Sequence, residues 1–165
     1  MKNKLVLLSG VILIFVLGTI FSGKFFSKRE VHYHAGFKLF IDGKLQDFSS
    51  AKYMSVKLCV GDEKEHKEDE QLEKAHLHDG VGDVVHVEAE EAKWKDLFMN
   101  ISYKINPGKQ ITGFVNGKKV ENILDHSIKS YDSVVIFSGH VNEKLLQNAV
   151  TKQKIMDAEK KSEAC

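Results

Sequence analysis

Five histidines fall in two short stretches of this 165-residue chain, and each stretch contains an H-x-H pair. His32 and His34 lie in VHYHAGFKLFIDGK, whereas His76, His78 and His86 lie in HLHDGVGDVVHVEAE. In a β-strand, residues i and i+2 point to the same face roughly 7 Å apart, so each pair can present two imidazoles side by side. Because imidazole nitrogens bind zinc at about 2.0–2.1 Å, each stretch is predicted to supply half of a metal site.

The register of the second stretch decides whether its three histidines share a face. A hairpin with a three- or five-residue loop in DGVGD pairs His76 with His86 and turns all three to one side. A two-residue loop would instead turn His86 to the opposite face. Gly82 suits the left-handed position of a three-residue loop, which favours the first register. Whether the first stretch joins this cluster depends on the order of strands in the sheet.

The expected ligand set is rich in imidazole and has carboxylates nearby. Such a set suits Zn, Cu(II) or Ni rather than Mg or Ca, and Zn or Cu is the expected cofactor. Asp79, Asp83 and Glu88 either bind the ion or orient an imidazole that binds it. A hydrogen-bonded histidine cluster without metal and a pH-responsive cluster are the alternatives. The predicted metal ligands are His32, His34, His76, His78, His86, Asp79 and Glu88.

The segment from Leu5 to Gly23 contains 19 residues without a charge. As a helix it would be roughly 28 Å long, which is about the thickness of a bilayer hydrocarbon core. It predicts a single-pass membrane anchor, with residues 1–29 as anchor and spacer. A cleaved signal peptide is the alternative, although the residues around Ser22 fit a cleavage site poorly. Both interpretations place the bulk of the chain outside the cytoplasm.

The cysteines and the charges exclude two other classes of function. Cys59 and Cys165 form no C-x-x-C, so the usual redox motif is absent. Outside the cytoplasm a disulfide between them is permitted, and two unpaired thiols are the alternative. The 24 Lys and Arg nearly balance the 23 Asp and Glu, which argues against nucleic acid as a partner.

Hydrophobic periodicity predicts the elements that must position the histidines. Val31 to Ile41 alternates between apolar and polar residues, which predicts a half-buried strand, and Asp42-Gly43 predicts a hairpin turn. An apolar stripe at helical spacing predicts a helix from Glu91 to Ile101. Asn142 is the predicted cap of a last helix. The remaining predicted elements are strands at 44–48, 76–78, 84–89, 110–115, 118–121 and 133–138, and the last helix at 143–160.

The stretch from WKDLF through ITGFVNGKKVEN to YDSVVIFSG resembles the second half of β-grasp domains, including sulphur-carrier-like and transcobalamin-C-terminal-like members. The resemblance covers about residues 84–138. It implies an α+β domain over residues 30–140, with a mixed sheet and a crossing helix, followed by a C-terminal helix and tail at 141–165. The chain continues past Gly139 into a predicted helix, so the Gly-Gly tail of the sulphur carriers and their conjugation role are not implied.

The H-x-H strands and the H-L-H-D-G segment also resemble small membrane-anchored, histidine-rich proteins, and that likeness implies no mechanism. Together these features predict a membrane-anchored, extracytoplasmic domain that binds Zn or Cu through strand histidines. A non-enzymatic module that docks an envelope protein is the alternative. A metal-dependent hydrolase is a third interpretation, because three histidines and an open position would suit it. The chain has no H-E-x-x-H and no nucleophile motif, so no catalytic residue is predicted.

Overall fold

The computed structural model of the chain describes residues 31–55 and 70–162, all of which belong to one compact unit, Val31–Cys165. No helix within these described ranges is long and apolar enough to cross a membrane. The predicted anchor at 5–23 lies outside the described residues, and so do both cysteines. The fold class is α+β, with a mixed sheet and a C-terminal helix, as the element order predicts.

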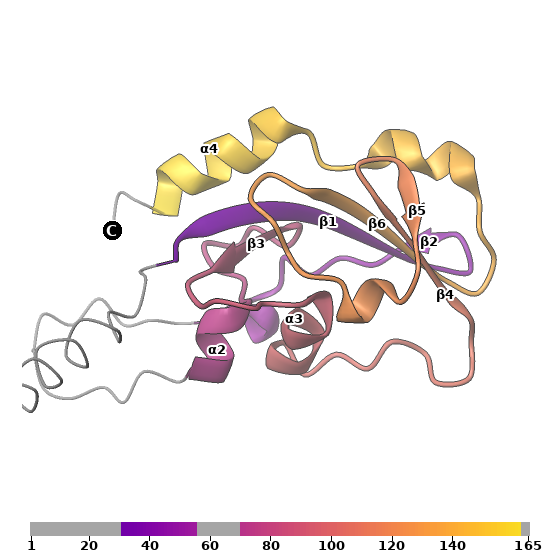
Figure 1. Cartoon of the computed structure of the whole chain (residues 1–165), viewed down its shortest axis with the longest axis horizontal. Coiled ribbons are helices and arrows are strands. Elements are labelled where there is room, and N and C mark those ends of the chain that lie inside the picture. Colours follow the sequence, from indigo (N-terminus) through magenta and orange to yellow (C-terminus); the bar gives the residue numbers. More distant parts are fainter. Residues whose placement is uncertain (1–30, 56–69, 163–165) are drawn as a thin grey trace, which may run out of the picture. The chain divides into compact units, whose positions relative to one another are not determined.

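A mixed six-stranded sheet forms the centre of the domain (Figure 1). Its two central strands, β1 (Tyr33–Ile41) and β6 (Ser133–Ser138), are parallel neighbours. Two short strands pair antiparallel with the edge of β1 that faces away from β6. β3 (Val84–Val87) pairs with its first half, and β2 (Lys44–Leu45) pairs with its end. The first half of β1, which carries His34 and directly follows His32, therefore lies beside β3.

A second hairpin completes the other side of the sheet. β4 (Ile111–Val115) pairs antiparallel with β6, and β5 (Lys118–Val120) pairs with β4. Asn116 and Gly117 connect them with φ angles of 50° and 77°. Both central residues of a type I′ turn need positive φ, which is why this hairpin was predictable from the dipeptide. The strand order is β2-β1-β6-β4-β5, with β3 beside β1.

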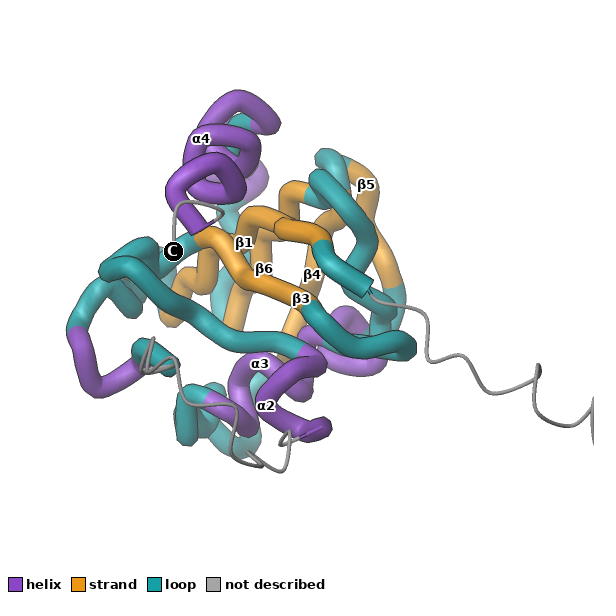
Figure 2. The backbone as a smooth tube through the Cα atoms, turned by 90° about the vertical axis from the view of Figure 1, so that its left-hand side faces the viewer, coloured by secondary structure: helices purple, strands orange, loops and turns teal. Residues whose placement is uncertain are grey.

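Helices cover both faces of the sheet, as Figures 1 and 2 show from two directions. α2 (Glu70–Lys74) and α3 (Trp94–Asn100) lie on one face, and α4 (Lys152–Ser162) packs over β1 on the opposite face. The described residues also form short 3-10 helices at Ala51–Tyr53, Ile123–Asp125 and Glu143–Asn148.

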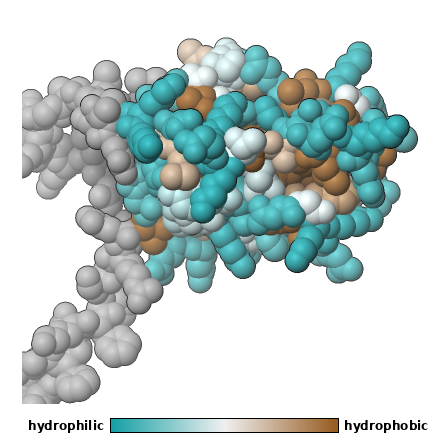
Figure 3. All heavy atoms as spheres, turned by 90° about the horizontal axis from the view of Figure 1, so that it is seen from above, coloured by the Kyte–Doolittle hydropathy of each residue, from teal (hydrophilic) through white to brown (hydrophobic). Residues whose placement is uncertain are grey.

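The main hydrophobic core lies between the sheet and α3. The apolar parity of β1 points into it, and the stripe of α3 faces it, which is the packing that the two periodicities predict. A second cluster lies on the α4 side, where the partly buried Leu145 and Leu146 pack against it. Figure 3 shows that the surface on this side is mostly hydrophilic, with an apolar area toward one end. The largest fully buried side chains include Trp94, Phe37, Phe48, Phe137, Leu39, Leu77, Leu97 and Ile136.

The prediction that β1 is half-buried is wrong, because α4 also covers the face of β1 that carries its polar residues. The close approach depends on Gly36, where an added Cβ would lie only 2.5 Å from Val150 Cβ. Ile155 of α4 is fully buried next to it. His34, on the same parity as Gly36, is therefore 1% exposed rather than on an open surface.

Several element boundaries differ from the predictions for local reasons. α3 begins at Trp94 rather than Glu91, because Glu91 has a φ of 59° and the Asp96 side chain accepts a hydrogen bond from the Lys93 amide. The predicted strand at 76–78 forms only isolated bridges at two residues. The predicted strand at 44–48 is only two residues long, ending at Leu45.

The predicted helix at 143–160 consists of two helices. Asn142 caps the first, as predicted, by accepting a hydrogen bond from the Lys144 amide. The chain then leaves helical geometry so that Val150 can pack against the sheet. Thr151 caps the start of α4, because its hydroxyl accepts a hydrogen bond from the Lys154 amide.

Candidate metal centre

Three histidines lie directly opposite one another on three neighbouring segments. His34 pairs with His86 in the β1–β3 ladder. His86 in turn pairs with His76 through main-chain hydrogen bonds of 2.9 and 3.0 Å in an isolated antiparallel bridge. The predicted register of His76 opposite His86 is confirmed, but the left-handed residues of the connecting loop are Asp79 and Gly80, and the prediction that Gly82 takes this conformation is wrong. β3 therefore lies between β1 and the segment 76–78, which brings the two histidine stretches together.

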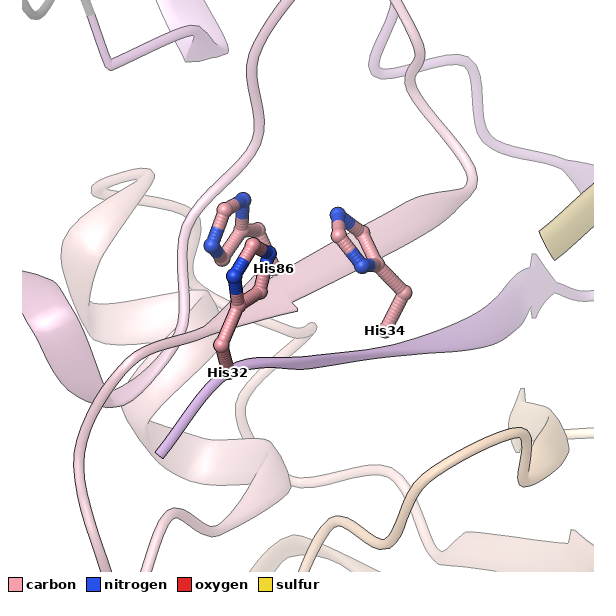
Figure 4. A group of neighbouring side chains, drawn as sticks. All are labelled: His32, His34 and His86. Carbon is pink, nitrogen blue, oxygen red and sulfur yellow. The ribbon is translucent and has the colours of Figure 1, made fainter. Parts of the chain in front are cut away.

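The five histidines form one group, called here the five-histidine cluster, with His86 at its centre. The ring centroid of His86 lies 4.5 Å from that of His34 and 4.6 Å from that of His32. It lies 4.8 Å from the centroids of both His76 and His78. Figure 4 shows the rings of His32, His34 and His86 on the same side of their two strands.

Two overlapping sets of three histidines in this cluster have donor nitrogens within 4.8 Å of one another, and both include His86. The inner triad consists of His76, His78 and His86, and the outer triad consists of His32, His34 and His86. The donor nitrogens of a tetrahedral zinc site stand about 3.3 Å apart, so an ion requires only small ring movements.

Three of the rings are buried, and burial makes two of them resist protonation. Desolvation lowers the pKa of His34 to about 4, although the carboxylate of Glu159 acts in the opposite direction. Desolvation and the neighbouring histidines, His76 first, lower the pKa of His86 far below the ordinary value. Both rings are therefore neutral at neutral pH, which is the form in which histidine binds a metal.

Oxygen atoms contact the other ring nitrogens of the inner triad. His78 Nδ1 lies 2.5 Å from Asp79 Oδ2, and His76 Nδ1 lies 3.1 Å from the Leu72 carbonyl oxygen. A carbonyl oxygen only accepts hydrogen bonds, so His76 Nδ1 donates, and in the neutral ring Nε2 is the nitrogen that carries the lone pair. Glu88 Oε1 lies 3.5 Å from His86 Nε2, a contact at ion-pair distance that does not meet hydrogen-bond geometry.

This arrangement distinguishes the roles of the predicted residues. All five predicted histidines lie in the cluster. Asp79 and Glu88 lie beside ring nitrogens at its border, where they can orient His78 and His86 rather than bind an ion themselves. His32 is exposed, so the outer triad is open to solvent on one side.

Sequence reasoning missed Asn100, at the end of α3. Its side-chain amide donates hydrogen bonds to the carbonyl oxygens of Gln71 at 2.8 Å and Ala75 at 2.7 Å. These bonds hold the chain immediately before His76. A polar residue ending an apolar helical stripe was the available signal, but its partners are more than twenty residues away in the sequence.

Sequence reasoning also missed Glu159 on α4. Its Oε1 lies 3.8 Å from His34 Nδ1, and its Oε2 accepts a 2.6 Å hydrogen bond from the Tyr131 hydroxyl. No spacing within the sequence connects these three residues, because only the packing of α4 over β1 brings them together.

Comparisons of the chain with protein-family models, curated proteins and solved structures gave no match. Function is therefore inferred from the geometry and chemistry of the five-histidine cluster.

Proposed function

We propose that this domain binds a transition-metal ion, Zn or Cu, at the inner triad of His76, His78 and His86. Each of these three rings has one nitrogen beside an oxygen atom. The donor nitrogens of the three rings lie within 4.8 Å of one another, and this combination is the observation that carries the proposal. Protein metal sites hold their histidines in this way, because the outer oxygen fixes the tautomer and the orientation of the ring.

The chemistry of the donors supports Zn or Cu. Imidazole nitrogen suits both ions, whereas Mg and Ca prefer oxygen ligands. His34 lies in register with His86, and its ring centroid is 6.0 Å from that of His78. Its donor nitrogen groups with those of His32 and His86, so His34 supplies a fourth nitrogen to the inner triad after a movement of its ring. The exposed His32 ring stacks on His86, so a water molecule can take its place beside an ion that enters.

We also propose that the domain is β-grasp-like and is held outside the cytoplasm by an anchor at residues 5–23. A parallel central pair, β1 and β6, flanked by the β1–β2 and β4–β5 hairpins, supports the fold likeness, with β3 as an addition. The support for the anchor is the uncharged segment itself.

A partner-docking role without metal is the second candidate. It is favoured by a mostly apolar hollow of about 520 Å³ between α3 and β4, where Met99 is 57% exposed. A hydrolase would need an open coordination position and a base to activate water. Glu88 is placed to orient His86, so the hydrolase remains the weakest proposal.

Metal content tests the proposal directly. The full-length protein, purified with a tag that contains no histidine, is loaded with excess Zn or Cu, dialysed and analysed by elemental mass spectrometry. We expect about one ion per chain in the wild type and none in His76→Ala/His78→Ala. The matched control, His126→Ala/His140→Ala, also loses two histidines but retains the metal. A wild type that retains no metal would overturn the metal site and favour the docking role.

A further inference from the structure

Glu159 connects α4 to the five-histidine cluster. One carboxylate oxygen faces His34 Nδ1 at 3.8 Å, and the other accepts the hydrogen bond from the Tyr131 hydroxyl. The Glu159 side chain is only 21% exposed, and it projects from the part of α4 that follows the fully buried Ile155. The packing of α4 thus determines where this carboxylate lies.

His34 is the residue through which Glu159 can act on a metal ion. A ring that faces the carboxylate through Nδ1 can bind an ion through Nε2. Coordination draws electron density from the imidazole, which makes the remaining N–H a stronger donor to a carboxylate. The contact between His34 and Glu159 would therefore strengthen when metal is bound.

We propose that Glu159 is a positioning residue that orients His34 as the fourth metal ligand, so that metal binding and the docking of α4 stabilise each other. This inference rests on the proposed metal site at the inner triad. Its physical basis is linkage: if docked α4 raises the metal affinity by some factor, bound metal favours docked α4 by the same factor. Tyr131 holds the second carboxylate oxygen and so limits how the Glu159 side chain can turn.

The first test measures zinc affinity in the full-length protein by competition with a chromophoric chelator. Glu159→Gln keeps the size of the side chain but removes its charge, and we expect an affinity about 10- to 100-fold weaker, as for other outer carboxylates. Asp157→Asn is the matched control, because Asp157 is on the same helix and its side chain contacts Gln153. Its affinity should equal that of the wild type.

The second test measures amide hydrogen exchange over residues 152–162 with and without zinc. In the wild type, zinc should slow this exchange. In His34→Ala, zinc still binds at the inner triad but should no longer slow exchange in α4. A purely structural role for Glu159 predicts a different result, in which Glu159→Gln speeds exchange equally with and without zinc. Tyr131→Phe, which leaves the carboxylate in place, should weaken zinc binding less than Glu159→Gln does.

The outcomes separate this inference from the proposed function. If the wild type binds zinc, but Glu159→Gln binds it equally well and zinc leaves exchange in α4 unchanged, the coupling is wrong and the metal site stands. If the wild type binds neither zinc nor copper, both proposals fail together.

Discussion

His78 Nε2 and His86 Nδ1 lie 2.6 Å apart, facing each other across the turn that precedes β3. One of these two nitrogens must carry the hydrogen of that contact, since two bare lone pairs would repel each other. The same two residues belong to the inner triad. An ion that binds there takes the place of the shared hydrogen, which moves to the other nitrogen of the same ring, beside Asp79 or Glu88.

The first prediction is therefore that zinc binding changes the tautomer of one ring of this pair. The hydrogen between the two rings should move to an outer nitrogen, beside Asp79 or Glu88. Nitrogen-15 NMR of the imidazole rings, recorded with and without zinc, distinguishes protonated from bare nitrogens directly. Unchanged ring-nitrogen signals in the zinc-bound protein would show that no ion displaces this hydrogen.

The second prediction concerns His78, whose side chain is 21% exposed and can be removed with little loss of packing. We expect His78→Ala to weaken zinc binding by more than about tenfold, because loss of an outer partner alone costs about 10- to 100-fold. Its thermal unfolding should change little. His140→Ala removes an exposed histidine outside the cluster and is the control. Equal affinity in the two variants would remove His78 from the ligand set.

The third prediction concerns Asn100. In Asn100→Ala the carbonyl oxygens of Gln71 and Ala75 lose their donor, which should lower the free energy of unfolding by about 1–3 kcal/mol. Zinc affinity should fall as well, because these bonds hold the chain next to His76. Met99→Ala changes an exposed neighbour on the same helix and should affect neither quantity. Urea denaturation and chelator competition measure both. Normal zinc affinity in Asn100→Ala would show that the inner triad does not need this anchor.

The fourth prediction concerns the contact between β1 and α4. Gly36→Ala places a methyl group against Val150 and should destabilise the protein by about 1–3 kcal/mol. Val150→Gly removes the Cβ that the new methyl group would meet, so the double variant should be more stable than the sum of the two single effects predicts. Strict additivity in urea denaturation would mean that the two residues do not meet in solution.

The fifth prediction concerns the metal-free protein. The pKa of His34 lies near 4 in the folded state, against an ordinary value of 6.5. Between these values the unfolded chain binds a proton at this residue and the folded chain does not. The free energy of unfolding should therefore fall as pH is lowered through this window. Urea denaturation after treatment with a chelator measures the slope, and His34→Gln should make it shallower. An unchanged slope would show that His34 is protonated in the folded state.

Local pattern was sufficient to predict much of the fold. The β6 boundaries, the hairpin at Asn116-Gly117 and the α3 stripe depend on residues close in the sequence, and the structure has them. The pairing of His76 with His86 also followed, because a hairpin loop restricts register. The break between the last two helices was missed because Val150 leaves the helix only to meet Gly36, a contact across more than a hundred residues.

The amino-acid sequence by itself determined which side chains can bind a metal and that the H-x-H spacing turns them to one face of a strand. The tertiary structure alone decided that β1 and the segment 76–78 lie on either side of β3, which places His86 at the centre of the cluster. It alone placed α4 over β1 and Glu159 beside His34. The physical reason is that strand order and helix packing depend on burying apolar surface across the whole domain, and no local periodicity encodes that.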